Sequence, residues 1–264
     1  MSGLGRCSLT AVIPILSVMG IQAVPLPTAL LSTQTDGFGG FTFRDLTDDL
    51  EPYFEHILSS VDGFDAFYSG FLGSYEQIDK ILCMAQRLKG KTPFFVDTVM
   101  ADGGKLYTTY TYEMVGGMRK LASCAQLITP NVTEACFLLE KEYKEEYSKE
   151  EIAHLVRGLS KITKGDIVVT GIKGKHSVNS AYSTDGGITV GFSENEAVDC
   201  HFPGTGDIFA SVLIGCLLKD KSLAYAVKCA SGFVKSVMEH SLKFDYPTRE
   251  GVLLEDKLFE LRNF

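Results

Sequence analysis

The sequence predicts an α/β protein whose mostly parallel sheet is covered by helices on both faces. Short, fully apolar segments of strand length alternate along the chain with longer segments of helical periodicity. A strand buried on both faces reads as a continuous apolar run, which is typical of parallel sheets between helices. The length of 264 residues allows one large core, so we expect a single domain over residues 1–264.

The first elements lie in an uncharged stretch from Leu9 to Leu31. Three prolines and a glycine interrupt this stretch, and such breaks argue against a membrane span. The stretch also lacks the basic start and the cleavage pattern of a signal peptide. We interpret it as a buried helix near residues 8–18 followed by a buried strand near residues 20–25.

The remaining elements follow in the same alternation. The expected strands are Ile21–Pro25, Ala66–Ser69, Phe94–Asp97, Ala125–Thr129 and Ile167–Thr170. The expected helices lie near residues 44–60, 75–89, 110–122, 131–139, 149–162 and 222–241. A hairpin is expected around residues 176–199, because Asp185-Gly186-Gly187 is typical of a tight turn.

Composition restricts the partners. The net charge of −8 and a pI near 5.2, without a cluster of lysine or arginine, argue against nucleic acid. The seven cysteines are scattered and none has C-x-x-C spacing, which favours reduced thiols in a cytoplasm over disulfides or zinc. We therefore expect a cytoplasmic protein that does not bind nucleic acid.

The most informative segment is Phe202-Pro203-Gly204-Thr205-Gly206-Asp207, a glycine-rich turn that leads into an apolar helix. Glycines let a ligand approach the backbone, and the free amides of a helix N-terminus favour an anion. A carboxylate beside an anion cradle needs a role, and accepting a proton from an attacking alcohol is the simplest one. A loop that only caps a buried helix is the alternative.

Polar residues also follow several expected strands, where parallel sheets bind their ligands. Asp97 and Asp102 flank one strand end, Asn131 and Glu134 open a helix after another, and Thr170-Gly171 ends a third. Oxygen-bearing side chains such as these can hold Mg²⁺ through water, as is usual near nucleotide phosphates. Each group alone also fits an ordinary turn or helix cap, and only their shared place at one sheet edge indicates a binding site.

Together these residues resemble the ribokinase-like superfamily and, within it, the pyridoxal kinase family. Gly204-Thr205-Gly206-Asp207 is similar to the anion-hole and catalytic-base motif of the family, and Asn131-x-x-Glu134 to its magnesium-linked motif. Ser32-Thr33-Gln34-Thr35-Asp36-Gly37-Phe38 resembles the vitamin-binding turn, and Asp65–Phe71 the strand end beside it. The resemblance covers essentially the whole chain and implies the three-layer ribokinase-like fold.

The resemblance implies ATP-dependent phosphorylation of the 5′-hydroxymethyl group of a B6 vitamer: pyridoxal, pyridoxamine or pyridoxine. Asp207 would be the base, and Gly204, Thr205 and Gly206 would form the anion hole. Mg²⁺, a monovalent cation such as K⁺, and a homodimer are also implied. The other implied site residues are Asn131, Thr170, Gly171, Phe202, Phe233 and Val234 for ATP, Asp97, Asp102 and Glu134 for the metal, and Ser32, Thr35 and Phe71 for the vitamer.

The chain departs from the family pattern in two places. Relatives have a strand before a Ser-Gly-x-Gly turn, whereas Met1–Ser8 starts inside that turn, so we expect the first strand to be missing. This implies either an upstream start or a truncated form, because an absent interior strand leaves backbone groups unpaired. Gln34 stands where many relatives carry histidine, which leaves the vitamer preference open.

Three alternatives stay open or are disfavoured by single positions. A hydroxymethylpyrimidine kinase of thiamin synthesis has the same fold but typically carries cysteine where Asp207 stands. A sugar kinase usually has alanine between the glycines and a diglycine motif near its start, and neither is present. The alternative outside the enzymes is a truncated, non-catalytic remnant that binds a vitamer.

Overall fold

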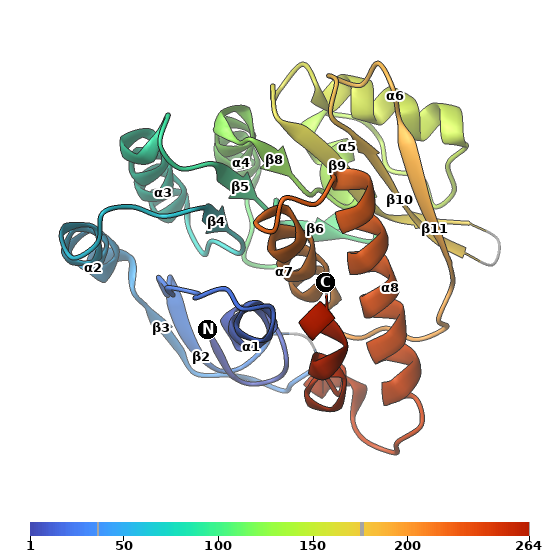
Figure 1. Cartoon of the computed structure of the whole chain (residues 1–264), viewed down its shortest axis with the longest axis horizontal. Coiled ribbons are helices and arrows are strands. Elements are labelled where there is room, and N and C mark those ends of the chain that lie inside the picture. Colours follow the sequence, from blue (N-terminus) through green and yellow to red (C-terminus); the bar gives the residue numbers. More distant parts are fainter. Residues whose placement is uncertain (36, 175–176, 264) are drawn as a thin grey trace. The chain divides into compact units, whose positions relative to one another are not determined.

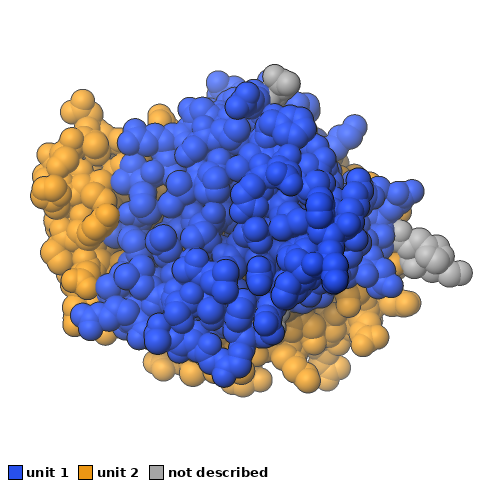
Figure 2. Space-filling model, turned by 90° about the horizontal axis from the view of Figure 1, so that it is seen from below, with its two compact units in different colours: residues 1–47, 195–264 blue, residues 48–194 orange. Residues whose placement is uncertain are grey.

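The computed structural model describes residues 1–35, 37–174 and 177–263 (Figure 1). Asp36, which belongs to the expected vitamin-binding turn, lies outside these residues. The chain divides into two compact units, which Figure 2 colours separately. The first unit comprises Met1–Thr47 and Asn195–Phe264, and the second comprises Asp48–Glu194. The expectation of one domain over residues 1–264 stays a prediction.

The first unit contains a three-stranded sheet in the order β1 (Ser2–Leu4), β2 (Ala29–Thr33) and β3 (Phe43–Asp45). β1 pairs with β2 in parallel, and β2 pairs with β3 in antiparallel. β1 occupies residues that we expected inside a turn, and β3 was not expected from the sequence.

The strand expected at Ile21–Pro25 is wrong, because the structure places β2 at Ala29–Thr33 instead. A proline has no backbone N–H to donate to a sheet, and Pro25 ends the segment that we interpreted as a strand, with Pro27 two residues further on. The next proline-free segment forms the ladder.

Three helices complete the core of the first unit: α1 (Leu9–Val18), α7 (Thr205–Leu217) and α8 (Leu223–Ser241). α7 packs against both α1 and α8, and every residue from Ile208 to Cys216 is buried. A helix that is apolar all round is expected in such an enclosed position. Two 3₁₀ helices, η1 (Thr248–Glu250) and η2 (Glu255–Asn263), follow, and η2 packs against α1.

The second unit contains a six-stranded sheet in the order β11-β10-β9-β8-β5-β4 (Figure 1). Its strands are β4 (Phe67–Ser69), β5 (Phe94–Val96), β8 (Leu127–Ile128), β9 (Asp166–Lys173), β10 (Ser177–Ser183) and β11 (Gly191–Glu196). The pairs from β4 to β9 are parallel, and β10 is antiparallel to β9. The mostly parallel sheet and the hairpin at its end are confirmed.

One helix, α2 (Thr47–Ser59), precedes β4 in the sequence. Four helices lie between the strands: α3 (Tyr75–Leu88), α4 (Tyr112–Cys124), α5 (Val132–Leu138) and α6 (Lys149–Leu159). Each falls within a predicted range or deviates from it by at most a few residues. Their starts have side-chain caps: the Ser74 hydroxyl accepts from the Gln77 amide, and Ser148 and Glu151 form a reciprocal capping box. A short hairpin, β6 (Ala101–Asp102) with β7 (Lys105–Leu106), follows β5.

Among the described residues, no helix combines the length and the apolar character that crossing a membrane requires.

Candidate active site

The glycine-rich turn forms the start of α7. Gly204 is the N-cap of this helix and has a left-handed backbone with φ of 86°. A Cβ atom at this position would lie 2.2 Å from the carbonyl oxygen of Arg6 and 3.0 Å from the Cα atom of Cys7. Both the dihedral angle and the space therefore require glycine at residue 204.

The backbone amides at this helix start are arranged for an anion. The first intrahelical hydrogen bond runs from the Ile208 amide to the Gly204 carbonyl, at 3.1 Å. The amides that precede it in a helix have no intrahelical acceptor, and the helix dipole adds a partial positive charge there. The turn residues Gly204, Thr205 and Gly206 therefore have the geometry expected of an oxyanion-binding turn.

Asp207 lies in the first turn of α7, where its carboxylate meets the start of α1. The backbone amide of Ser8 donates to Oδ2 of Asp207 at 2.7 Å. Ser8 is one of the few residues other than glycine with a positive φ, 51°, in the part of the chain that the structure describes. Such strained backbones persist where surrounding contacts fix them.

Burial raises the pKa of Asp207, while the Ser8 amide and the α-ammonium group of Met1 act in the opposite direction. A carboxylate with a raised pKa is a stronger base than an exposed one. The nearby thiol of Cys7 is buried, and its burial and the charge of Asp207 raise its pKa to about 11. Cys7 is therefore a neutral neighbour, whereas Asp207 is the group able to take a proton.

The second unit contains a buried carboxylate network around Glu134. Glu134 accepts three hydrogen bonds: from the Met100 amide at 3.0 Å, the Thr98 hydroxyl at 3.2 Å and the Asn131 amide at 2.8 Å. Asn131 returns the contact by accepting from the Glu134 amide at 2.9 Å, which forms a capping box at the start of α5. Burial and the charge of Asp97 raise the pKa of Glu134 well above its usual range.

Asp97 follows β5 and is also buried. Its Oδ1 atom accepts from the Thr129 hydroxyl at 2.9 Å. Asn131 forms an isolated parallel bridge with Thr170, whose amide donates to the Pro130 carbonyl at 2.9 Å. The structure thus brings Asn131, Glu134, Asp97 and Thr170 together at consecutive strand ends, as the parallel sheet predicted.

Asp102 is separate from this network. It is exposed, and its Oδ1 atom accepts from the neighbouring Gly103 amide at 2.7 Å. The described residues contain no group of three or more His, Cys, Asp or Glu side chains that could hold a metal ion. Because three donors already occupy Glu134, this set fits an ion held through water better than one ligated directly. Asp97, Asp102 and Glu134 as metal residues stay a prediction.

The remaining predicted residues differ in exposure. Phe202 and Phe233 are buried in the first unit, where the Phe202 ring stacks on that of Tyr246, and Val234 is partly buried. Ser32 and Thr35 are exposed residues of the first unit, and Phe71 is a half-buried residue of the second. The Ser32 hydroxyl accepts from the Thr42 amide at 2.8 Å. Gly171 is exposed and has a positive φ of 69°. Roles for these residues in binding ATP or a vitamer stay predictions.

Sequence reasoning missed Ser8 and Thr98, which contact the carboxylates directly. Ser8 acts through its backbone amide, which its residue type does not reveal, and Thr98 lies just after a strand, where a hydroxyl is common. Ser8 is the first residue of the helix expected near residues 8–18, and only this place at a helix start could have drawn attention to it.

A family model described as phosphomethylpyrimidine kinase matches residues 9–250. The chain belongs to this family. The family match covers the Gly204–Asp207 turn, Asn131 and Glu134, and it confirms the ribokinase-like kinase resemblance that the motifs indicated.

Solved structures agree with this family assignment and with the α/β fold. A provisionally named phosphomethylpyrimidine kinase from Bacteroides thetaiotaomicron, crystallised with pyridoxal, is 37% identical, with a TM-score of 0.94 over 99% of this chain and 92% of its own. Pyridoxal kinase from Lactobacillus plantarum is 28% identical, with a TM-score of 0.91 over 99% of this chain and 93% of its own.

A curated relative is similar over a shorter segment. A provisionally named pyridoxal kinase from Caenorhabditis elegans is 29% identical over 175 residues, which are 63% of this chain. The matched segment spans 53% of the length of that relative.

Proposed function

We propose that this member of the phosphomethylpyrimidine kinase family phosphorylates the 5′-hydroxymethyl group of a B6 vitamer with ATP. The observation that carries the proposal is Asp207, a carboxylate with a raised pKa in the first turn of α7, directly after a left-handed glycine at the helix start. In this proposal Asp207 accepts the proton of the alcohol as its oxygen attacks the γ-phosphoryl group.

The turn at the start of α7 supplies the second requirement of the reaction, which is charge stabilisation. Phosphoryl transfer depends on positioning and on electrostatic stabilisation of the transferring oxygens. The amides of the Gly204–Gly206 turn are fixed before the reaction, because Gly204 packs closely against the Arg6 carbonyl and is the N-cap of α7. Such a preorganised turn stabilises developing negative charge without reorganisation.

ATP and Mg²⁺ would use the network of the second unit. Asn131, Thr170, Asp97 and Glu134 lie at consecutive strand ends and carry oxygen and amide groups of the kinds that suit hydrated Mg²⁺ and phosphate. When bound, the ion would neutralise charge on the phosphates. That these residues and Asp207 serve one reaction is part of the proposal. A role for K⁺, a homodimer and a cytoplasmic location also remain predictions.

The vitamer is proposed from two sources. A relative 37% identical to this chain is crystallised with pyridoxal, and a second relative is a pyridoxal kinase. Gln34 is buried, and its Nε2 atom donates to the Arg249 carbonyl at 2.8 Å. The side-chain amide of Gln34 offers different hydrogen-bonding groups from the histidine of many relatives. The preferred vitamer is therefore to be determined by experiment.

Hydroxymethylpyrimidine is the second candidate substrate, because the matched family is described by the related phosphomethylpyrimidine kinase reaction. Both substrates carry a hydroxymethyl group on a nitrogen heterocycle, so the same base and anion hole would serve either. Asp207 in place of cysteine favours the B6 vitamer.

The test is ATP-dependent phosphorylation of pyridoxal, pyridoxamine, pyridoxine and hydroxymethylpyrimidine by the purified full chain. We expect kcat/KM to be at least about tenfold higher for one B6 vitamer than for the pyrimidine, a difference that one or two specific hydrogen bonds supply. A preference for hydroxymethylpyrimidine would change the proposed substrate but leave the proposed kinase activity standing. A folded protein that turns over none of the four would overturn the proposal.

A further inference from the structure

Arg6, Cys7 and Ser8 connect β1 to α1 and touch the candidate site at two points. We name them the Arg6–Ser8 segment. At one end the Arg6 carbonyl oxygen lies 2.2 Å from where a Cβ atom of Gly204 would stand. At the other end the Ser8 amide donates to Asp207 at 2.7 Å. The same three residues therefore border both the anion-binding turn and the predicted base.

Arg6 fixes this segment to the C-terminal part of the first unit. Its backbone amide donates to the Glu250 carbonyl at 3.0 Å, and its Nη1 atom donates to the same oxygen at 3.3 Å. Its Nε atom donates to both carboxylate oxygens of Glu255, at 2.8 and 2.9 Å. One side chain thus connects two points of the chain about 250 residues away in the sequence.

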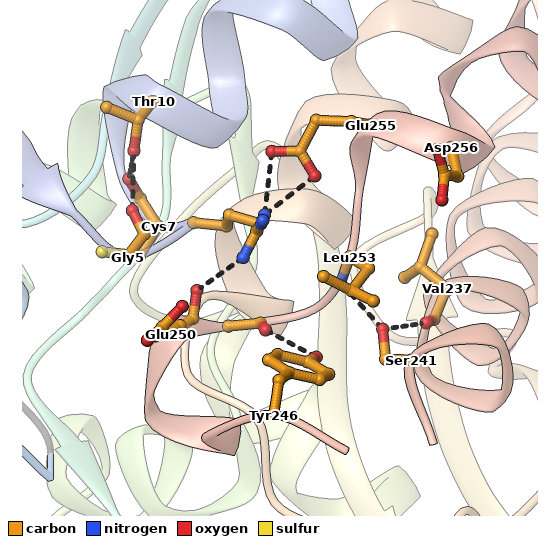
Figure 3. Close-up of polar contacts among 12 residues, drawn as sticks. Gly5, Cys7, Thr10, Val237, Ser241, Tyr246, Glu250, Leu253, Glu255 and Asp256 are labelled. Atoms are coloured by element: carbon orange, nitrogen blue, oxygen red, sulfur yellow. Dashed lines mark hydrogen bonds and ion pairs between the residues drawn. The ribbon is translucent and has the colours of Figure 1, made fainter. Parts of the chain in front are cut away.

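The C-terminal side of this connection is itself fixed. The Tyr246 hydroxyl donates to the Gly251 carbonyl at 2.8 Å (Figure 3). The Leu253 amide donates to the Ser241 hydroxyl at 2.8 Å, and this hydroxyl donates to the Val237 carbonyl of α8 at 2.6 Å. A Cβ atom at Gly251, whose φ is 78°, would lie 3.1 Å from the Arg6 amide nitrogen. Arg6 is therefore attached to a C-terminal segment that hydrogen bonds fix to α8.

The ion pair is not placed to contribute much stability. The Arg6 side chain is 26% exposed and that of Glu255 is 65% exposed, and ion pairs this open are screened by water. Its geometry, however, is specific, because one guanidinium donates to the Glu255 carboxylate and to the Glu250 carbonyl together. Replacing Arg6 should therefore change the position of residues 6–8 more than the stability of the protein.

From these contacts we propose that Arg6 is a positioning residue for phosphoryl transfer: it holds the Arg6–Ser8 segment so that the Ser8 amide meets Asp207 and the Arg6 carbonyl braces Gly204. The inference rests on the proposed function for its kinetic consequence. Arg6 itself acts through the backbone and through Asp207.

The groups that face Asp207 determine how its pKa changes when the Arg6–Ser8 segment moves. The Ser8 amide and the α-ammonium group of Met1 lower the pKa of Asp207, and the charge of Asp207 raises the pKa of Cys7. α1 carries no charged side chain. α8, the other helix packed against α7, carries exposed or ion-paired charges: Lys228, Lys235, Glu239 and His240. Moving the Ser8 amide away therefore removes a contribution that lowers the pKa, and the pKa of Asp207 rises.

The kinetic test compares Arg6→Ala and Arg6→Lys with the full-length wild type. We expect kcat of Arg6→Ala to fall about 30-fold with a smaller change in KM, since misplacing a reacting group by about 1 Å costs up to 100-fold. The acidic limb of the pH profile should move to higher pH. Arg6→Lys keeps the charge without the fork of donors and should recover only part of kcat. Arg119→Ala, which removes an exposed pair with Glu140 at 2.8 Å, is the matched control and should change neither.

A second measurement is independent of catalysis. The pKa of Asp207, followed by NMR of carboxyl-labelled protein and assigned with Asp207→Asn, should be higher in Arg6→Ala than in the wild type. If Arg6→Ala does not fold, Glu255→Gln, which weakens the same contact, takes its place and should shift the pKa in the same direction. An unchanged or lower pKa of Asp207 would overturn the inference, even if the wild type phosphorylates a vitamer. A raised pKa in a protein that turns over no substrate would uphold the positioning and overturn only the proposed function.

Discussion

Replacing Gly204 with alanine tests the geometry of the turn more sharply than any other single change. The native φ of 86° is left-handed, and the new Cβ atom would lie 2.2 Å from the Arg6 carbonyl oxygen. That oxygen belongs to backbone held by Glu250, so it has little freedom to retreat. The substitution must therefore distort α7, the Arg6–Ser8 segment or both.

The magnitude follows from three contributions. The left-handed backbone costs alanine about 1–2 kcal/mol, and forcing an extra methyl group into packed structure costs about 1–3 kcal/mol. Reduced freedom of the unfolded chain returns about 0.4–1 kcal/mol. The free energy of unfolding of Gly204→Ala should thus fall by about 2–4 kcal/mol, which lowers Tm by roughly 5–15 °C for a chain of this size.

Gly206→Ala is the matched control, two residues away in the same turn. Gly206 has no heavy atom within 4 Å of its Cβ position, and it lies inside α7. Alanine in a helix is more stable than glycine by about 0.5–1 kcal/mol, so Gly206→Ala should leave Tm unchanged or raise it. Thermal unfolding followed by circular dichroism measures both variants. Equal stability of Gly204→Ala and Gly206→Ala would refute the steric reasoning.

Three further predictions concern stability. Burial raises the folded pKa of Asp207 above its unfolded value, so the native state binds more protons between these two pKa values, and stability falls as pH rises through that window. Asp207→Asn should therefore be more stable than the wild type at pH 7. Titration of Tm into acid should show this difference vanish as the pH falls toward the unfolded pKa. Glu134→Ala leaves two buried donors and one partly buried donor unpaired and should lower the free energy of unfolding in urea by about 3 kcal/mol or more. Ser148→Ala removes one half of the capping box of α6 and should cost about 1 kcal/mol in the same assay, whereas an unchanged value would show that this helix start does not depend on its cap.

The elements that could be predicted from the sequence are those with long or continuous apolar patterns. β5 and α8 fall at their expected positions because burial alone specifies them. The strand assignment at Ile21–Pro25 failed because an apolar run shows burial but not pairing, and a sheet needs amide donors that prolines lack. β3 is exposed along its length, so it has no apolar signal to detect.

The candidate site divides in the same way. The helix start at Gly204 and the Asn131–Glu134 helix cap could be predicted, because glycine and capping residues report a required geometry through their type. The roles of these residues and of Asp207 in a reaction stay predictions. The Ser8 amide and the Arg6 connection to Glu255 could not be predicted, since one is a backbone atom and the other joins residues that are distant in the sequence. Contacts of this kind depend on tertiary structure and leave no local pattern.

The central claim is that Asp207 accepts the proton of a B6 vitamer alcohol during transfer of the γ-phosphoryl group of ATP. The most direct measurement is single-turnover formation of the 5′-phosphate by wild type and by Asp207→Asn, followed by ³¹P NMR on folded protein with matched nucleotide binding. Because general-base catalysis contributes about 10²–10⁴-fold, the rate should fall by at least about 100-fold in Asp207→Asn. An unchanged rate would contradict the account.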